Sequence, residues 1–182
     1  MTHGRAPSGF VVFLRGVNVG THKRFRPSVL AGELADLGVV NVGAAGTFVV
    51  RGKIDQAALR KEFGHRLPFK TEVMICPGRE LIDLVRRDPF GPTVPSKAVR
   101  RFLSVMEAAP PTRPPVPVAR PAGAKWEVKV IAVSGRYALS LWRRLGRRVL
   151  YPNEVVETLF DVSATTRGWD TINTIYRILE AS

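Results

Sequence analysis

A glycine-bearing loop near the start of the chain carries side chains that suit anion binding. It follows an apolar run and contains Arg15, Gly16, Asn18, Gly20 and Lys23. Backbone N–H groups in such a turn, between an expected strand and an expected helix, can converge on a phosphate. Arg15 and Lys23 would add charge-assisted contacts. In the structural alternative, the glycines only permit a tight turn and Asn18 hydrogen-bonds the local backbone.

A second candidate lies near the C-terminus, where Thr165, Thr166 and Arg167 precede Trp169. At the start of an expected helix these residues would offer donors to an anion, and the helix dipole would assist. Trp169 could stack on a base or another planar ligand. In the structural alternative, the threonines cap the helix and Trp169 fills the core, because it shares a helical face with other apolar residues.

A third candidate is an arginine cluster in the segment 143–148, which lies between Trp142 and Tyr151. Its arginines are Arg143, Arg144, Arg147 and Arg148. Aromatic rings interleaved with arginines suit a nucleic-acid backbone and its bases. The cluster contains no base-reading signature, so binding through it would be mostly electrostatic and sensitive to salt. An ordinary exposed loop is the alternative.

No catalytic or metal-binding motif accompanies these candidates. The first loop has neither the P-loop spacing nor the dinucleotide-binding spacing. The three histidines, His3, His22 and His65, show no metal-ligand spacing, and no nucleophile with a partner base is visible. Cys76 is the single cysteine, which excludes an intramolecular disulfide, and its apolar surroundings indicate a core position. The sequence therefore predicts no metal and no cofactor, and it leaves open whether the protein is an enzyme.

The formal net charge of +13 is concentrated in two blocks. Residues 1–26 hold five basic and no acidic side chains, and residues 97–148 hold twelve basic and two acidic ones. Concentrated positive charge attracts polyanions through steering and counterion release. We therefore predict a binding protein for polyanions such as nucleic acid. The alternatives are a solvated surface without a partner, and an enzyme or sensor that binds a phosphate-bearing small molecule between the Arg15–Lys23 loop and the Arg167 loop.

Apolar patterning predicts an α+β protein. β-Branched runs predict four strands in the first half, and helical spacing of leucines predicts two helices among them. The strands are expected at residues 10–14, 39–42, 48–50 and 72–76, and the helices at 27–37 and 54–63. This β-α-β-β-α-β order is the ferredoxin-like pattern. No apolar run approaches the roughly 18 residues of a membrane span, so we expect a cytoplasmic protein without a membrane partner.

The second half is expected to be a decorated α+β region. A helix should end near Asp88, and strands should follow at 101–106, 126–133 and 137–142, the last two as a hairpin. Six prolines between residues 109 and 121 predict an extended, solvent-facing connection, and two helices should close the chain. The expected organisation is a flexible tail at 1–8, a ferredoxin-like half at 9–77 and a second half at 78–182.

Two motifs together resemble a known family. They are LRGVNVG at residues 14–20 and TTRGWDT at residues 165–171. The pair is similar to the bacterial domain-of-unknown-function 1697 family, over roughly residues 9–181. The resemblance implies an α+β fold with a ferredoxin-like N-terminal half, and it implies no activity. This chain has Gly168 and Asp170 where the resemblance leads us to expect asparagines, so part of any amide-based ligand site would be missing.

Overall fold

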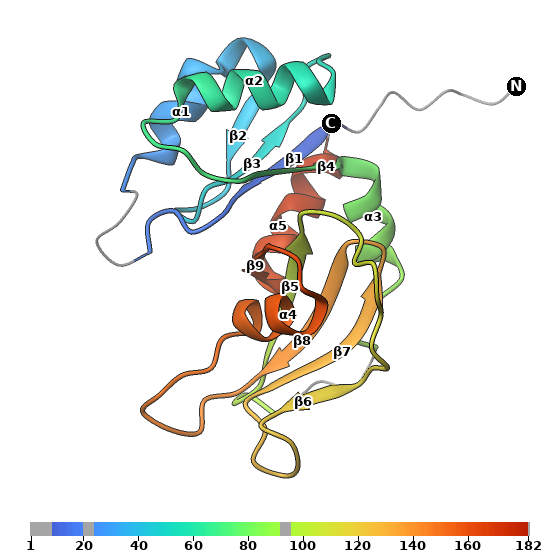
Figure 1. The fold of residues 1–182 in the computed structure, drawn as a ribbon. Coiled ribbons are helices and arrows are strands. Elements are labelled where there is room, and N and C mark those ends of the chain that lie inside the picture. Colours follow the sequence, from blue (N-terminus) through green and yellow to red (C-terminus); the bar gives the residue numbers. More distant parts are fainter. Residues whose placement is uncertain (1–8, 20–23, 92–95, 182) are drawn as a thin grey trace, which may run out of the picture. The chain divides into compact units, whose positions relative to one another are not determined.

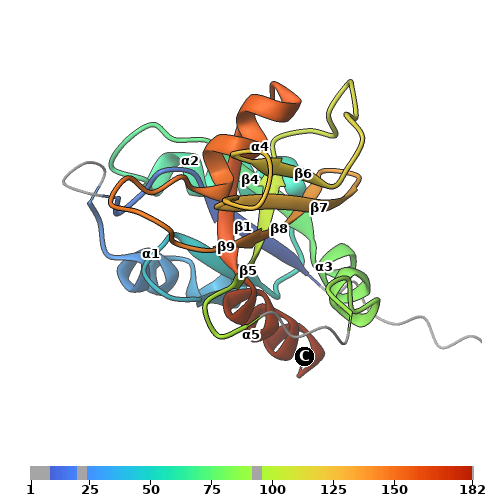
Figure 2. The same cartoon turned by 90° about the horizontal axis from the view of Figure 1, so that it is seen from below.

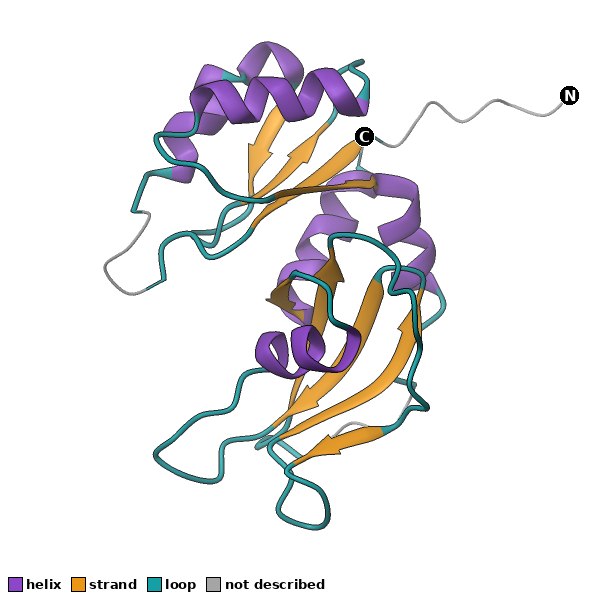
Figure 3. Cartoon of the chain, viewed as in Figure 1, coloured by secondary structure: helices purple, strands orange, loops and turns teal. Residues whose placement is uncertain are grey.

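The computed structural model describes residues 9–19, 24–91 and 96–181. It shows an α+β protein in which helices accompany two antiparallel sheets (Figures 1, 2 and 3). The chain forms two compact units. The first comprises residues up to Arg87 together with those from Asn173 onward, and the second comprises Asp88–Ile172. Among the described residues, no helix has the length and apolar character needed to cross a membrane.

The first unit contains a four-stranded antiparallel sheet in the order β2-β3-β1-β4. Its elements follow the β-α-β-β-α-β order expected from the sequence, with one additional 3-10 turn. They are β1 (Phe10–Leu14), α1 (Pro27–Glu33), η1 (Ala35–Leu37), β2 (Val39–Asn41), β3 (Thr47–Val50), α2 (Gln56–Arg66) and β4 (Val73–Pro77). Helix α3 (Gly78–Arg86) and the later part of α5 (Trp169–Glu180) also belong to this unit.

A side-chain contact joins these two helices. The Arg86 guanidinium of α3 donates a hydrogen bond to the Glu180 carboxylate of α5 at 2.7 Å, and hydrogen bonds to Tyr176 and Glu180 raise the pKa of Arg86.

Local signals in the sequence explain where these helices begin and end. Pro27 occupies the first turn of α1, where its missing N–H costs nothing. Gly38 follows η1 in the left-handed conformation, with φ of 60°, which glycine adopts without strain. The Asp55 carboxylate caps α2 by accepting a hydrogen bond from the Ala58 N–H at 2.8 Å.

The Asp55 cap gives a testable expectation for stability. Replacing Asp55 with alanine should lower the free energy of unfolding by about 1 kcal/mol, because the Ala58 N–H loses its side-chain partner. Urea denaturation followed by circular dichroism measures the change. Asp55→Asn is the matched control, since asparagine also caps helices well and should lose only a few tenths of that amount. Equal losses in both variants would contradict this role for the side chain.

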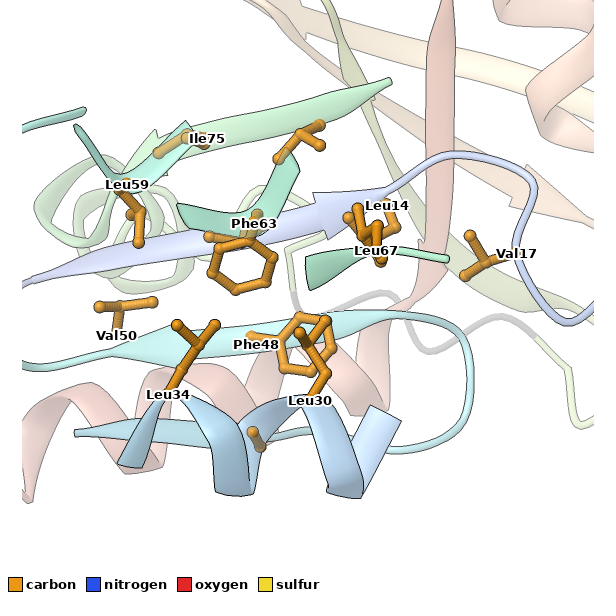
Figure 4. Close-up of a cluster of buried hydrophobic side chains, with 13 residues drawn as sticks. Leu14, Val17, Leu30, Leu34, Phe48, Val50, Leu59, Phe63, Leu67 and Ile75 are labelled. Atoms are coloured by element: carbon orange, nitrogen blue, oxygen red, sulfur yellow. The ribbon is translucent and has the colours of Figure 1, made fainter. Parts of the chain in front are cut away.

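The core of the first unit lies between the sheet and the helices α1 and α2 (Figure 4). Phe48 of β3 and Phe63 of α2 meet edge to face with ring centroids 5.3 Å apart, and both are fully buried. The opposite sheet face is buried as well, including Val11, Phe13 and Cys76. Cys76 is thus a fully buried core residue, as its apolar surroundings predicted.

The second unit contains a five-stranded antiparallel sheet in the order β6-β7-β8-β5-β9. Its strands are β5 (Arg100–Met106), β6 (Val118–Arg120), β7 (Val128–Ser134), β8 (Tyr137–Trp142) and β9 (Ala164–Gly168). Helix α4 (Pro152–Phe160) covers one face, where Val155, Val156 and Phe160 pack on the sheet. The hairpin of β7 and β8 forms as predicted, and α5 begins directly after β9.

Two features of this unit were not predicted from the sequence. The proline-rich segment contains a strand, because β6 pairs with β7 at the edge of the sheet, where proline is tolerated. The alternation of side chains along β7 is also interrupted. The pairing with β8 shifts register between Val130 and Ala132, so Val130 faces the α4 core and Ala132 leaves that face.

Candidate nucleic-acid interface

Strand pairing in the second sheet gathers basic residues that are dispersed in the sequence. In the strand register, Trp142 of β8 lies opposite Arg100 of β5 on one side and opposite Val128 of β7 on the other. Val128 in turn lies opposite Arg120 of β6. The starts of β5 and β7 therefore lie beside the ends of β6 and β8. Figure 1 shows the loops 121–127 and 143–151 at this same end. We call it the basic end, and its cationic residues are Lys97, Arg100, Arg101, Arg120, Lys125, Lys129, Arg143, Arg144, Arg147 and Arg148.

The basic end therefore collects ten of the twelve cations in the block 97–148. Arg136 lies in the turn at the opposite end of β7 and β8, where its Nε donates to the Met106 carbonyl at 2.7 Å. Of the two acids in the block, Glu107 follows β5 at that opposite end, and Glu127 lies at the basic end. The positive charge of this block is consequently concentrated at one end of the sheet.

Trp126 anchors two of these cations. The Arg143 guanidinium lies 4.2 Å from its ring centroid, and the Lys129 ammonium lies 4.7 Å away. Arg143 also donates from Nε to the Trp126 carbonyl at 2.7 Å and from Nη2 to the Ala124 carbonyl. Arg143 thus stabilises the loop before β7. The sequence predicted Arg143 only as a nucleic-acid contact and did not indicate this structural role.

The other arginines of the cluster remain accessible. Arg144, Arg147 and Arg148 are exposed, and the Arg144 Nε makes a local hydrogen bond to the Gly146 carbonyl at 3.2 Å. Leu145 between them is 51% exposed. Of the four predicted arginines, Arg143 therefore bonds the backbone of the neighbouring loop, and the other three are exposed to solvent.

A hollow of about 450 Å³ lies beside the start of β5. It is lined by Val99, Arg100, Arg101, Phe102, Gly168, Trp169 and Asp170. Arg101 lies 5.6 Å from the ring centroid of Phe90, which meets Trp169 edge to face at 4.9 Å. Two guanidinium groups, one carboxylate and aromatic rings thus surround a concave surface at the start of β5.

Arg167 occupies a different position from the one expected. It lies in β9, opposite Leu103 of β5, and not in a helix start. Its side chain is only 8% exposed, and its Nη1 donates to Thr165 Oγ1 at 2.8 Å and to the Thr166 carbonyl at 2.9 Å. Burial lowers the pKa of the guanidinium to about 10, which still leaves it charged at neutral pH. Arg167 is therefore a buried structural cation.

The neighbours of Arg167 are engaged in packing as well. The Thr166 hydroxyl meets Ser104 Oγ at 2.7 Å and donates to Asn153 Oδ1 of α4 at 3.1 Å. Thr165 is 4% exposed and Trp169 is 7% exposed. The structural alternative for Trp169, a place in the core, is the one that the structure shows.

The first loop is likewise held by internal contacts. Arg15 pairs with Glu72 at 3.2 Å. Asn18 has a φ of 54°, donates from Nδ2 to the Ala44 carbonyl at 2.7 Å and accepts the Phe25 N–H at 3.0 Å. Asn18 therefore bonds the backbone, as the structural alternative for this loop expected, and Gly16 turns the chain with a φ of 64°. Gly20, Lys23, His22 and the predicted tail at 1–8 lie outside the described residues.

The two predicted halves of a small-molecule site fall in different units. Arg15 and Asn18 belong to the first unit, and Thr165, Thr166, Arg167 and Trp169 belong to the second. A phosphate-bearing ligand shared by both loops stays a prediction. Across residues 9–19, 24–91 and 96–181, no group of three or more His, Cys, Asp or Glu side chains could hold a metal ion.

Comparisons with known proteins agree with the family resemblance. Residues 8–132, more than half of the chain, match the family described as "Protein of unknown function (DUF1697)". A conserved bacterial protein from Streptococcus pneumoniae has a similar structure, with a TM-score of 0.54 and 14% sequence identity. The match covers 93% of this chain and 97% of that one, and at this identity it shows the fold alone. No curated protein matches the chain.

Proposed function

The chain belongs to the DUF1697 family of proteins of unknown function, and we propose that it binds nucleic acid through the basic end of its second unit. The observation that supports this proposal is the strand register. It brings ten cations from separate segments to one end of a sheet, with Glu127 as the one acid from the same block. An even spread of the same charges would favour solubility without a polyanionic partner.

Contacts to phosphates dominate the proposed binding. Arg144, Arg147 and Arg148 are exposed on one loop, and guanidinium groups bind phosphate oxygens in a bidentate manner. Neutralised phosphates release condensed counterions, so affinity falls as salt rises. The described cations of the basic end lie at strand ends and in loops, and we therefore expect contacts mainly to phosphates and little sequence preference.

The basic block at 1–26 does not enter this proposal. Its cations are Arg5, Arg15, Lys23, Arg24 and Arg26, of which Arg5 and Lys23 lie outside the described residues and Arg15 pairs with Glu72. A contribution from this block to polyanion binding stays a prediction.

Fluorescence anisotropy with labelled oligonucleotides, repeated across salt concentrations, tests the proposal. We expect the logarithm of the association constant to fall linearly with the logarithm of salt concentration, with a slope close to the number of phosphates neutralised. Absence of binding at low salt would overturn the proposal.

A matched pair of triple variants locates the interface. Replacing Arg144, Arg147 and Arg148 together with alanine should weaken binding about tenfold or more at low salt and reduce the salt slope by about 2–3, because up to three phosphate contacts are lost. The control replaces Lys53, Lys61 and Lys70, which are exposed in the first unit. Both variants lower the net charge equally. Equal effects of the two triples would show that overall charge, and not the basic end, determines affinity.

A further inference from the structure

We infer that the nucleic acid bound at the basic end is single-stranded, and that its unpaired bases stack on Tyr151 and on the Trp126–Arg143 pair. This inference rests on the proposed function and specifies the substrate class of the same surface. Duplex DNA presents phosphates equally well, but its bases are already stacked on one another and cannot cover a protein ring. Exposed ring surface beside phosphate-binding arginines therefore favours unpaired bases.

Tyr151 is the first of the two stacking positions. Its side chain is 55% exposed, although a ring of this size usually lies mostly inside a protein. It follows Arg147 and Arg148 and precedes Pro152, which occupies the first turn of α4 and restricts the backbone there. A base stacked on this ring would place its phosphates beside the exposed arginines of the same loop.

Hydrogen bonds of Leu150, the residue before Tyr151, connect this segment to Glu127 and to Trp142. The Leu150 N–H donates to Glu127 Oε2 at 3.3 Å, and the Leu150 carbonyl accepts from Trp142 Nε1 at 2.8 Å. Leu150 is the chain neighbour of Tyr151, and Glu127 is the chain neighbour of Trp126. The segments that carry the two aromatic residues are consequently held next to each other, although they are distant in sequence.

The Trp126–Arg143 pair is the second stacking position. The guanidinium lies 4.2 Å from the ring centroid and is oriented by its bonds to the carbonyls of Trp126 and Ala124. Trp126 is half-buried, and the Lys129 ammonium also lies 4.7 Å from its ring centroid, so a base would stack on the part of the Trp126–Arg143 pair that these contacts leave open. Guanidinium planes and aromatic rings both accept a stacked base, and a group already held in place loses little conformational entropy on binding.

Paired substrates and a pair of Tyr151 variants test the inference. The substrates are a labelled oligothymidine and a labelled duplex of equal length at one salt concentration. We expect about tenfold tighter binding of the single strand. Tyr151→Leu should weaken single-strand binding about tenfold and leave duplex binding unchanged, because leucine keeps apolar bulk but has no ring. Tyr151→Phe keeps the ring and should bind as the unmodified protein does.

The outcomes separate this inference from the proposed function. Failure to bind either substrate would overturn both, and so would binding to anionic phospholipid vesicles in place of oligonucleotides. Equal binding of both substrates, or equal single-strand affinities for Tyr151→Leu and Tyr151→Phe, would overturn the inference and leave the proposed function standing. Thermal unfolding of both variants should match that of the unmodified protein, since the side chain is largely exposed.

Discussion

Replacement of Phe63 with alanine is expected to lower the free energy of unfolding by about 3–5 kcal/mol. Phe63 is fully buried between α2 and the first sheet, where it meets Phe48 edge to face at 5.3 Å. Truncation removes the ring contact and the buried apolar area, and it leaves a cavity that the surrounding sheet fills only in part. Chemical denaturation of the intact chain, followed by circular dichroism, measures the loss.

Two further variants of α2 set the scale for this measurement. Phe63→Leu keeps most of the buried volume and should lose clearly less stability than Phe63→Ala. Lys61→Ala, at an exposed position of the same helix, should stay within about 0.5 kcal/mol of the unmodified protein. A loss below about 1 kcal/mol for Phe63→Ala would contradict the position of this ring in the core.

Replacement of Arg167 with alanine should lower the free energy of unfolding by about 2–4 kcal/mol. The substitution removes a buried side chain and leaves Thr165 Oγ1 and the Thr166 carbonyl without this donor inside the protein. Denaturation compared with Arg177→Ala checks the expectation. Arg177 is an exposed arginine of α5, so its removal should change stability little. Equal stabilities for the two variants would contradict a structural role for Arg167.

Because Arg167→Ala is expected to be less stable, loss of ligand binding by this variant would not by itself show that Arg167 contacts the ligand. Sequence alone made Arg167 a candidate ligand for phosphate, so loss of binding in Arg167→Ala would have implied a contact. A destabilised protein loses binding for another reason, namely that less of it is folded. Binding by this variant is therefore informative only under conditions in which the variant is shown to be folded.

The sequence predicted most of the regular elements, because each carries a strong local signal. The run Phe10–Leu14 is apolar and β-branched and forms β1. The helix expected at 54–63 forms as α2 with Asp55 as its cap, and the expected hairpin forms with Gly135 in the turn between β7 and β8. These features depend on residues that lie close together along the chain, so a pattern of a few residues is sufficient to predict them.

Features that depend on distant residues were missed. The segment that contains Thr165, Thr166 and Arg167 forms β9 by pairing with β5 at the edge of the second sheet. Its expected place at the start of a helix was wrong because the pairing partner is distant in sequence. The register shift after Val130 depends in the same way on the partner strand β8. In each case tertiary pairing determined the conformation.

The candidate site was likewise predictable only in part from the sequence. Counting charges revealed a basic block at 97–148, but it did not show that Arg100, Arg120 and Arg143 share one end of a sheet. That conclusion requires strand order and register. Likewise, Arg143 contacts the Trp126 ring and the Ala124 carbonyl because of the conformation of the loop before β7. The spacing of residues in the sequence does not predict that conformation.

The prolines around β6 have a consequence for the behaviour of the protein at high concentration. An edge strand exposes backbone donors and acceptors that can recruit a strand from another molecule. β6 has only three residues, Val118–Arg120, and lies between Pro117 and Pro121, neither of which has an N–H to donate. Arg120 adds an exposed charge at the same position. The missing N–H groups and the charge therefore disfavour polymerisation by strand pairing along β6, which is one edge of the second sheet.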